Sequence, residues 1–94
     1  MGKLALLFLL GLLAPAWALD VNHATEAELD GLRGVGPAFT RRILAERALR
    51  PFVDWPDLMR RVSGMGGVTA QKLSAQGLTV QNQPLKQKPI AVKP

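Results

Sequence analysis

The chain has 94 residues, which is enough for one small domain. It carries 12 lysine and arginine residues against seven acidic ones, for a net charge of +5, and it has no cysteine. The absence of cysteine excludes disulfides, a thiolate metal site and lipid attachment through cysteine. Eight of the basic residues and all seven acids fall within residues 20–80, so the clustering of the arginines is more informative than the total charge.

The first 18 residues have the pattern of a signal peptide. Lys3 precedes an apolar run over residues 4–13, and Ala16-Trp17-Ala18 has the small-x-small form of a cleavage site. A membrane span takes about twenty apolar residues, and this run is shorter. We therefore expect cleavage after Ala18 and export to the periplasm, with no stable membrane anchor left. An uncleaved anchor is the alternative.

The mature chain is predicted to begin with a short helix that ends in a glycine hairpin. Thr25 and Glu28 have the spacing of a capping box. The helix is expected to cover about residues 26–32. Gly34 and Gly36 then bracket a single apolar residue, and glycine permits the positive φ that so tight a hairpin needs.

A second helix is predicted directly after this hairpin. Pro37 suits its first turn, and Pro51 ends it near residue 49. Phe39 and Ile43 supply apolar positions at helical spacing. The amides at the start of the helix have no intrahelical partner, so together with the helix dipole they form a site for a phosphate or another anion.

The same pattern recurs thirty residues later, which indicates an internal repeat. Leu29-x-x-Leu32-Arg33-Gly34-Val35-Gly36 corresponds to Met59-x-x-Val62-Ser63-Gly64-Met65-Gly66. A third helix capped by Asp54 and a fourth over about residues 68–75 complete the second copy. Residues 78–80 are expected to be extended and to close the core. The sequence thus predicts an all-α domain of two pseudo-symmetric units with four short helices, over residues 19–80.

Residues 81–94 are rich in proline, glutamine and lysine. Such a composition buries too little apolar surface to pack, so it predicts a disordered basic tail. The tail is either a solvated end of the chain or a basic arm that attracts phosphates without specificity.

These motifs resemble the helix-hairpin-helix domain of ComEA-type competence proteins, in its short periplasmic form. The resemblance covers about residues 19–80. It rests on the order and spacing of Asp20-Val21-Asn22-x-Ala24-Thr25-x-x-Glu28-Leu29, Gly34-Val35-Gly36-Pro37, Phe52, Asp57-Leu58, Gly64-Met65-Gly66 and Leu78-Thr79-Val80. It implies a tandem helix-hairpin-helix fold and an exported receptor. Such a receptor binds double-stranded DNA without sequence preference and helps to draw it inward for transformation. The resemblance further implies partners among the proteins of the DNA-uptake pilus or of an inner-membrane channel.

The resemblance also implies which residues contact backbone phosphates. In the first copy these are Gly34, Val35, Gly36 and Ala38, with Thr40 and Arg41 as side-chain candidates. The position of Arg42 beside Arg41 makes it a further candidate for DNA binding. In the second copy they are Gly64, Met65 and Gly66. Lys72 occupies the position of Arg42 in the repeat and is a further candidate for DNA binding. Neighbouring helix positions are about 100° apart, so one arginine of the pair is better aimed, and Arg41 is preferred because Arg42 lies beside Ile43. The second hairpin is expected to be mainly structural, because no charge follows it at residues 67–70.

Other arginines allow two interpretations. Arg33, Arg60 and Arg61 either extend a positive ridge or pair with acidic residues, for which the candidates are Glu26, Glu28 and Asp57.

No catalytic or metal-binding constellation is visible in the sequence. His23 is the only histidine and has no partner at a ligand spacing, so a surface or capping role is expected. We expect no enzyme activity, no metal and no cofactor. The alternative to DNA binding is a protein-interaction module in the cell envelope without DNA affinity. An accessory domain of a nuclease or repair system is less favoured, because the signal-peptide pattern points outside the cytoplasm.

Overall fold

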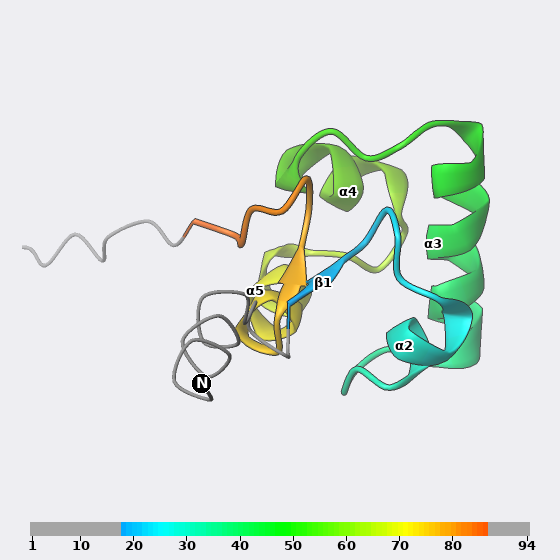
Figure 1. Ribbon diagram of the computed structural model, residues 1–94, viewed down its shortest axis with the longest axis horizontal. Coiled ribbons are helices and arrows are strands. Elements are labelled where there is room, and N and C mark those ends of the chain that lie inside the picture. Colours follow the sequence, from blue (N-terminus) through cyan, green and yellow to red (C-terminus); the bar gives the residue numbers. More distant parts are fainter. Residues whose placement is uncertain (1–17, 87–94) are drawn as a thin grey trace, which may run out of the picture.

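The computed structural model of the protein describes residues 18–86. The apolar part of the predicted signal peptide and the end of the predicted tail lie outside the described residues. Within them, the chain forms β1 (Leu19–Asp20), α2 (Glu26–Asp30), α3 (Pro37–Leu49), α4 (Trp55–Arg61), α5 (Gly67–Ala75) and β2 (Leu78–Thr79) (Figure 1). No helix in this part of the chain has the length and hydropathy to cross a membrane.

The four helices confirm the predicted all-α fold, and their starts follow from local sequence. The Glu28 amide donates to the Thr25 hydroxyl at 3.0 Å, and the Thr25 amide donates to the Glu28 carboxylate at 2.9 Å. This reciprocal pair is the predicted capping box. At α4, the Asp57 amide donates to the Asp54 carboxylate at 2.8 Å. Helix α2 ends at Asp30, two residues earlier than predicted, because Gly31 is a poor helix former.

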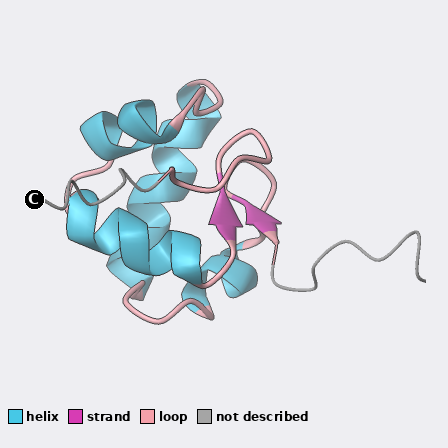
Figure 2. Cartoon of the chain, turned by 90° about the vertical axis from the view of Figure 1, so that its left-hand side faces the viewer, coloured by secondary structure: helices cyan, strands magenta, loops and turns pink. Residues whose placement is uncertain are grey.

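A two-stranded parallel sheet joins the two ends of the domain. β1 pairs with β2, with Leu19 opposite Leu78 and Asp20 opposite Thr79 (Figure 2). The ladder continues where the Val21 amide donates to the Thr79 carbonyl at 2.9 Å. The extended conformation predicted for residues 78–80 is confirmed, but the pairing of β1 with β2 depends on tertiary structure that local sequence does not specify.

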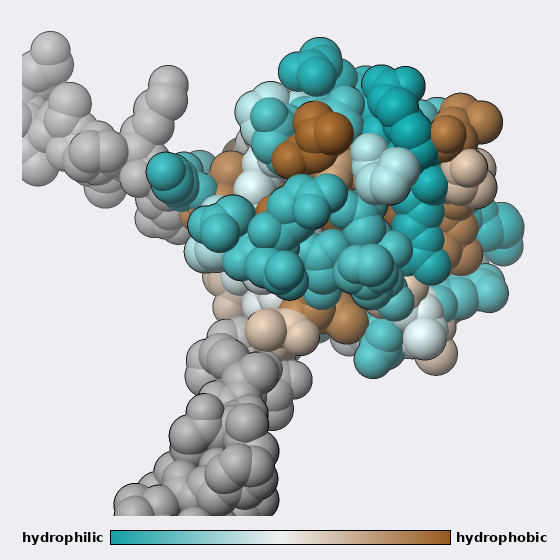
Figure 3. All heavy atoms as spheres, turned by 45° about the horizontal axis from the view of Figure 1, so that its top comes forward, coloured by the Kyte–Doolittle hydropathy of each residue, from teal (hydrophilic) through white to brown (hydrophobic). Residues whose placement is uncertain are grey.

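The first helical unit consists of α2 and α3, and the second consists of α4 and α5. The core lies between these two units and receives apolar side chains from every element. The fully buried large side chains are Val21, Leu29, Ile43, Phe52, Leu58, Val62, Met65, Leu73, Leu78 and Val80. In contrast, the face of the molecule in Figure 3 is mainly hydrophilic, with apolar surface in separate spots. The two units therefore pack on one shared core, as the repeat predicts.

Residues 81–86 lie against the domain, although the sequence places them in a disordered tail. The Trp55 indole donates to the Gln83 carbonyl at 2.9 Å, and the Gln81 side chain donates to the Phe52 carbonyl at 3.0 Å. The Leu85 amide donates to the Ser74 hydroxyl at 2.9 Å. The ordered domain thus extends past the predicted boundary, because these hydrogen bonds hold the chain to α4 and α5.

Candidate nucleic-acid interface

The two glycine hairpins, residues 33–36 (the first hairpin) and 63–66 (the second hairpin), have the same backbone. Gly34 has φ +93° and Gly64 has φ +95°, a conformation that only glycine adopts readily. Gly36 and Gly66 are extended N-caps of α3 and α5. The hairpins therefore match in shape as well as in sequence.

Both hairpins leave backbone amides without partners. Because the N-caps are glycines, no side chain covers the first amides of α3 or α5. In the described part of the chain, the amides of Gly34, Gly36 and Ala38 make no hydrogen bond. A Cβ added at Gly34 or Gly36 would meet no atom within 4 Å, so this surface is open. Free amides at the positive end of a helix dipole form an anion site.

Two predicted amide contacts are wrong for a physical reason. The Val35 amide donates to the Leu32 carbonyl at 3.1 Å, and the Met65 amide donates to the Val62 carbonyl at the same distance. Both side chains are buried in the core. The middle residue of each hairpin thus anchors the loop, and neither its amide nor its side chain is available to a ligand.

The predicted contact between Thr40 and a phosphate is also wrong. Its side chain is fully buried, and its hydroxyl donates to the Asp30 carboxylate. Its amide donates to the Gly36 carbonyl at 2.9 Å as part of the first helical turn. Thr40 therefore links α2 to α3 and offers nothing to a phosphate.

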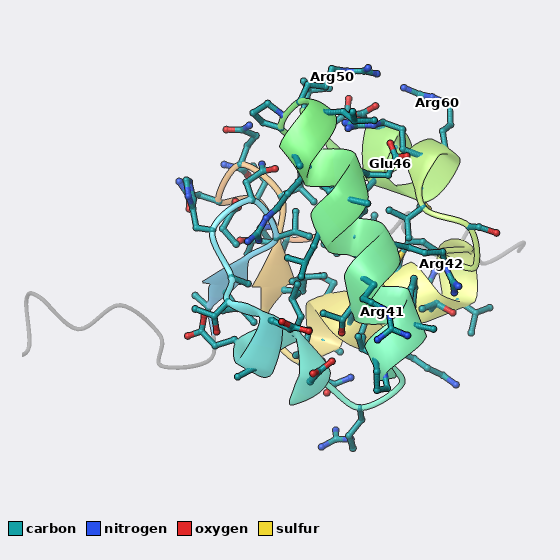
Figure 4. All side chains as sticks on the ribbon, turned by 90° about the vertical axis from the view of Figure 1, so that its right-hand side faces the viewer. Arg41, Arg42, Glu46, Arg50 and Arg60 are labelled. Carbon is teal, nitrogen blue, oxygen red and sulfur yellow. The ribbon has the colours of Figure 1, made fainter. Side chains whose placement is uncertain are left out.

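The paired arginines of α3 have different surroundings (Figure 4). Arg41 is exposed and makes no hydrogen bond or ion pair among the described residues. Arg42 is also exposed, but its Nε donates to the Ser63 carbonyl at 3.2 Å, and its guanidinium lies 5.4 Å from the centroid of the Phe39 ring. Arg42 is thus held against the second hairpin, whereas Arg41 is free beside the first.

Lys72 lies beside the first hairpin, although the sequence assigns it to the second copy. A cleft of about 450 Å³ separates the first hairpin from α5, and it is lined by Arg33, Gly34, Lys72, Ala75 and Gln76. Gln76 joins its two sides through hydrogen bonds to the backbone of Arg33. Gln76 carries no charge, motif or periodicity that could have singled it out in the sequence.

Other arginines act within the fold. Arg61 pairs with Asp57 at 3.0 Å and with Glu46 at 3.2 Å. Arg60 lies 3.6 Å from the Asp57 carboxylate. Arg47 donates hydrogen bonds to the carbonyls of Val21 and Ala24, in the loop that follows β1. Of the two interpretations of the arginines, pairing with Asp57 holds for Arg60 and Arg61, whereas neither pairs with Glu26 or Glu28.

The fold changes the pKa of the Asp57 carboxyl group. Burial alone would raise the pKa of Asp57. Hydrogen bonds from the Val53 amide and from Arg61, with the charges of Arg61 and Arg50, outweigh burial and lower that pKa below its ordinary value. The Asp57 side chain is therefore ionised inside the second unit.

No metal or base-stacking site is evident within residues 18–86. No group of three potential metal ligands gathers there, and His23 is exposed. Trp55 is buried, with its indole N–H bonded to a backbone carbonyl, so it belongs to the core.

One comparison with known proteins gave a result. The family described as the helix-hairpin-helix motif matches residues 16–76, which is more than half of the 94 residues. Neither the curated proteins nor the solved structures gave a match.

Proposed function

The chain belongs to the helix-hairpin-helix motif family, and we propose that it binds the backbone phosphates of double-stranded DNA without sequence preference. The observation that carries this proposal is the open row of unpartnered amides at the first hairpin, next to the free guanidinium of Arg41. Such motifs commonly bind DNA without specificity. Nothing in this row is shaped for the edge of a particular base.

The proposed contacts follow from the chemistry of a phosphodiester. The amides of Gly36 and Ala38 donate to phosphate oxygens, and Arg41 adds a charge-assisted hydrogen bond. Contacts to phosphate fix the position of the protein on the duplex but carry no sequence information. Binding is therefore weak for each molecule and depends strongly on salt.

We propose further that the protein works outside the cytoplasm, in the uptake of DNA for natural transformation. The signal-peptide pattern and the resemblance to ComEA-type proteins support this role. Intact mass measurement of the exported protein should give a chain that begins at Leu19. Deletion of the gene should lower the frequency of transformation, and an unchanged frequency would contradict this role.

Duplex binding is tested by fluorescence anisotropy with two unrelated duplexes. The two dissociation constants should agree within about twofold. With three or four phosphate contacts, affinity should fall about 40- to 150-fold between about 50 and 200 mM salt. Absence of binding at the lower salt concentration would contradict the proposal. Recovery of one specific envelope protein by the DNA-free chain would then support the alternative of a protein-interaction module.

A further inference from the structure

We propose that the cleft between the first hairpin and α5 is a second phosphate subsite, in which Lys72 and Arg33 hold a phosphate and Gln76 positions the hairpin. This inference rests on the proposed DNA binding. It differs from the amide site at the start of α3, because its two cations come from different units of the repeat.

The cleft has room for a phosphate group and carries the charge to attract one. Its volume is about 450 Å³, and its walls are the exposed residues Arg33 and Gly34 on one side and Lys72 of α5 on the other. The Lys72 amine and the Arg33 guanidinium make no hydrogen bond or ion pair within residues 18–86. Two unpaired cations facing one cleft favour an anion with more than one acceptor oxygen.

Gln76 fixes the two walls relative to one another. Its side-chain oxygen accepts from the Arg33 amide at 2.8 Å, and its side-chain nitrogen donates to the Arg33 carbonyl at 2.9 Å. The same nitrogen lies 3.3 Å from the Lys72 carbonyl. A neutral amide makes this bridge without adding a charge that would repel a phosphate. Gln76 is thus a positioning residue for the subsite.

The repeat explains why the site spans both units. In the repeat, Lys72 corresponds to Arg42, and Ser63 corresponds to Arg33. The longer helix of each unit lies against the hairpin of the other unit. At the second hairpin, the Arg42 guanidinium itself makes the bond to the Ser63 carbonyl. At the first hairpin, Gln76 makes the equivalent bond, which leaves the Lys72 amine free. The exchange therefore places a further cation, Lys72, beside the first hairpin.

The test compares the salt dependence of duplex binding in matched charge-removing variants. Lys72→Gln and Arg33→Gln each remove a cation from the cleft. Arg60→Gln removes an exposed cation near Asp57 and Arg50, at the opposite end of α3 from Arg41 (Figure 4). The plot of log affinity against log salt has a negative slope, and each cleft variant should make it less steep by about 0.9. Each should also weaken binding about five- to tenfold near 0.1 M salt. The control should change neither quantity.

Gln76→Ala supplies a readout of positioning. It should weaken binding while leaving the salt slope unchanged, and it should speed hydrogen exchange at the Arg33 amide, which loses its acceptor. A wild-type slope in both Lys72→Gln and Arg33→Gln would overturn the subsite but leave DNA binding intact. A wild-type chain that fails to bind duplex at low salt would overturn the proposed function, and the subsite with it.

Discussion

The two hairpins share one backbone but present different chemistry. Each has a glycine at positive φ and an extended glycine N-cap, and each uses its middle amide internally at 3.1 Å. The first is flanked by Arg33, Arg41 and Lys72, whereas the second has Ser63 and Gln71 at the positions that correspond to Arg33 and Arg41. The comparison shows that the fold requires the shared backbone, while the charges that suit a phosphate gather at one copy.

The start of the following helix differs in the same sense. Ala38 of α3 corresponds to Val68 of α5, whose side chain is 67 % exposed. The larger side chain of Val68 covers more of the surface where a phosphate would approach than the methyl group of Ala38 does. The second hairpin therefore fits a structural role better than the first.

The two units also differ in what holds them internally. The first unit has the neutral hydroxyl of Thr40 bonded to Asp30. The second has the buried Asp57, 3 % exposed, which is paired with Arg61. Because breaking a buried ion pair costs more than breaking a partly exposed hydrogen bond, stability should depend more on the second unit.

Replacement of Asp57 tests this difference with the largest expected effect. Asp57→Asn removes the charge that balances Arg61 and also weakens the hydrogen bond that the Val53 amide donates to the Asp57 carboxylate. The free energy of unfolding should fall by about 3 kcal/mol or more. Urea denaturation measures it, with Asp30→Asn as the matched change in the first unit and an expected loss of about 1 kcal/mol. Equal losses would contradict the difference between the units.

Lowering the pH should also destabilise the protein through Asp57 of the second unit. The pKa of Asp57 is lower in the folded protein than in the unfolded chain, where an aspartate titrates near about 3.9. The stability that Asp57 contributes is therefore complete well above about pH 4 and is lost as pH falls through the folded pKa. The melting temperature of the wild type should fall below about pH 4 more steeply than that of Asp57→Asn. Parallel curves would show that Asp57 does not carry the effect.

Thr40→Ala gives the first unit the residue that stands at the corresponding position 70 of the second. It removes the hydrogen bond to Asp30, so the free energy of unfolding should fall by about 1 kcal/mol. Duplex affinity should stay at the wild-type value because the side chain is buried. A loss of affinity without a loss of stability would return Thr40 to the set of DNA contacts.

The smallest expected effects come from exchanging the exposed residues of the two long helices. Arg41→Gln should weaken duplex binding about fivefold near 0.1 M salt, and Gln71→Arg should strengthen it about twofold. The gain is smaller because the hairpin beside residue 71 has fewer neighbouring cations. Anisotropy titrations measure both changes. Equal and opposite changes would indicate that the two hairpins bind DNA alike.

Local sequence was sufficient for the parts of the fold that depend on neighbours in the chain. The capping box at Thr25, the Asp54 cap and the two glycine hairpins were predicted because each depends on residues within a few positions. The crossing of Lys72 to the first hairpin was not predicted, because it depends on how the two units pack. The burial of Thr40 and the bridging role of Gln76 were missed for the same reason, since their partners are ten and forty-three residues away.

The most direct test of the central claim places one carboxylate on each hairpin in turn. A Cβ at Gly36 or Gly66 meets no atom within 4 Å, and aspartate is a favourable N-cap, so both variants should fold with unchanged or slightly higher stability. Gly36→Asp should weaken duplex binding about tenfold or more, because the carboxylate accepts the hydrogen bonds of the free amides and its charge repels phosphate. Gly66→Asp should weaken it by less than about threefold. A loss at Gly66→Asp as large as at Gly36→Asp, or full affinity in Gly36→Asp, would contradict the account.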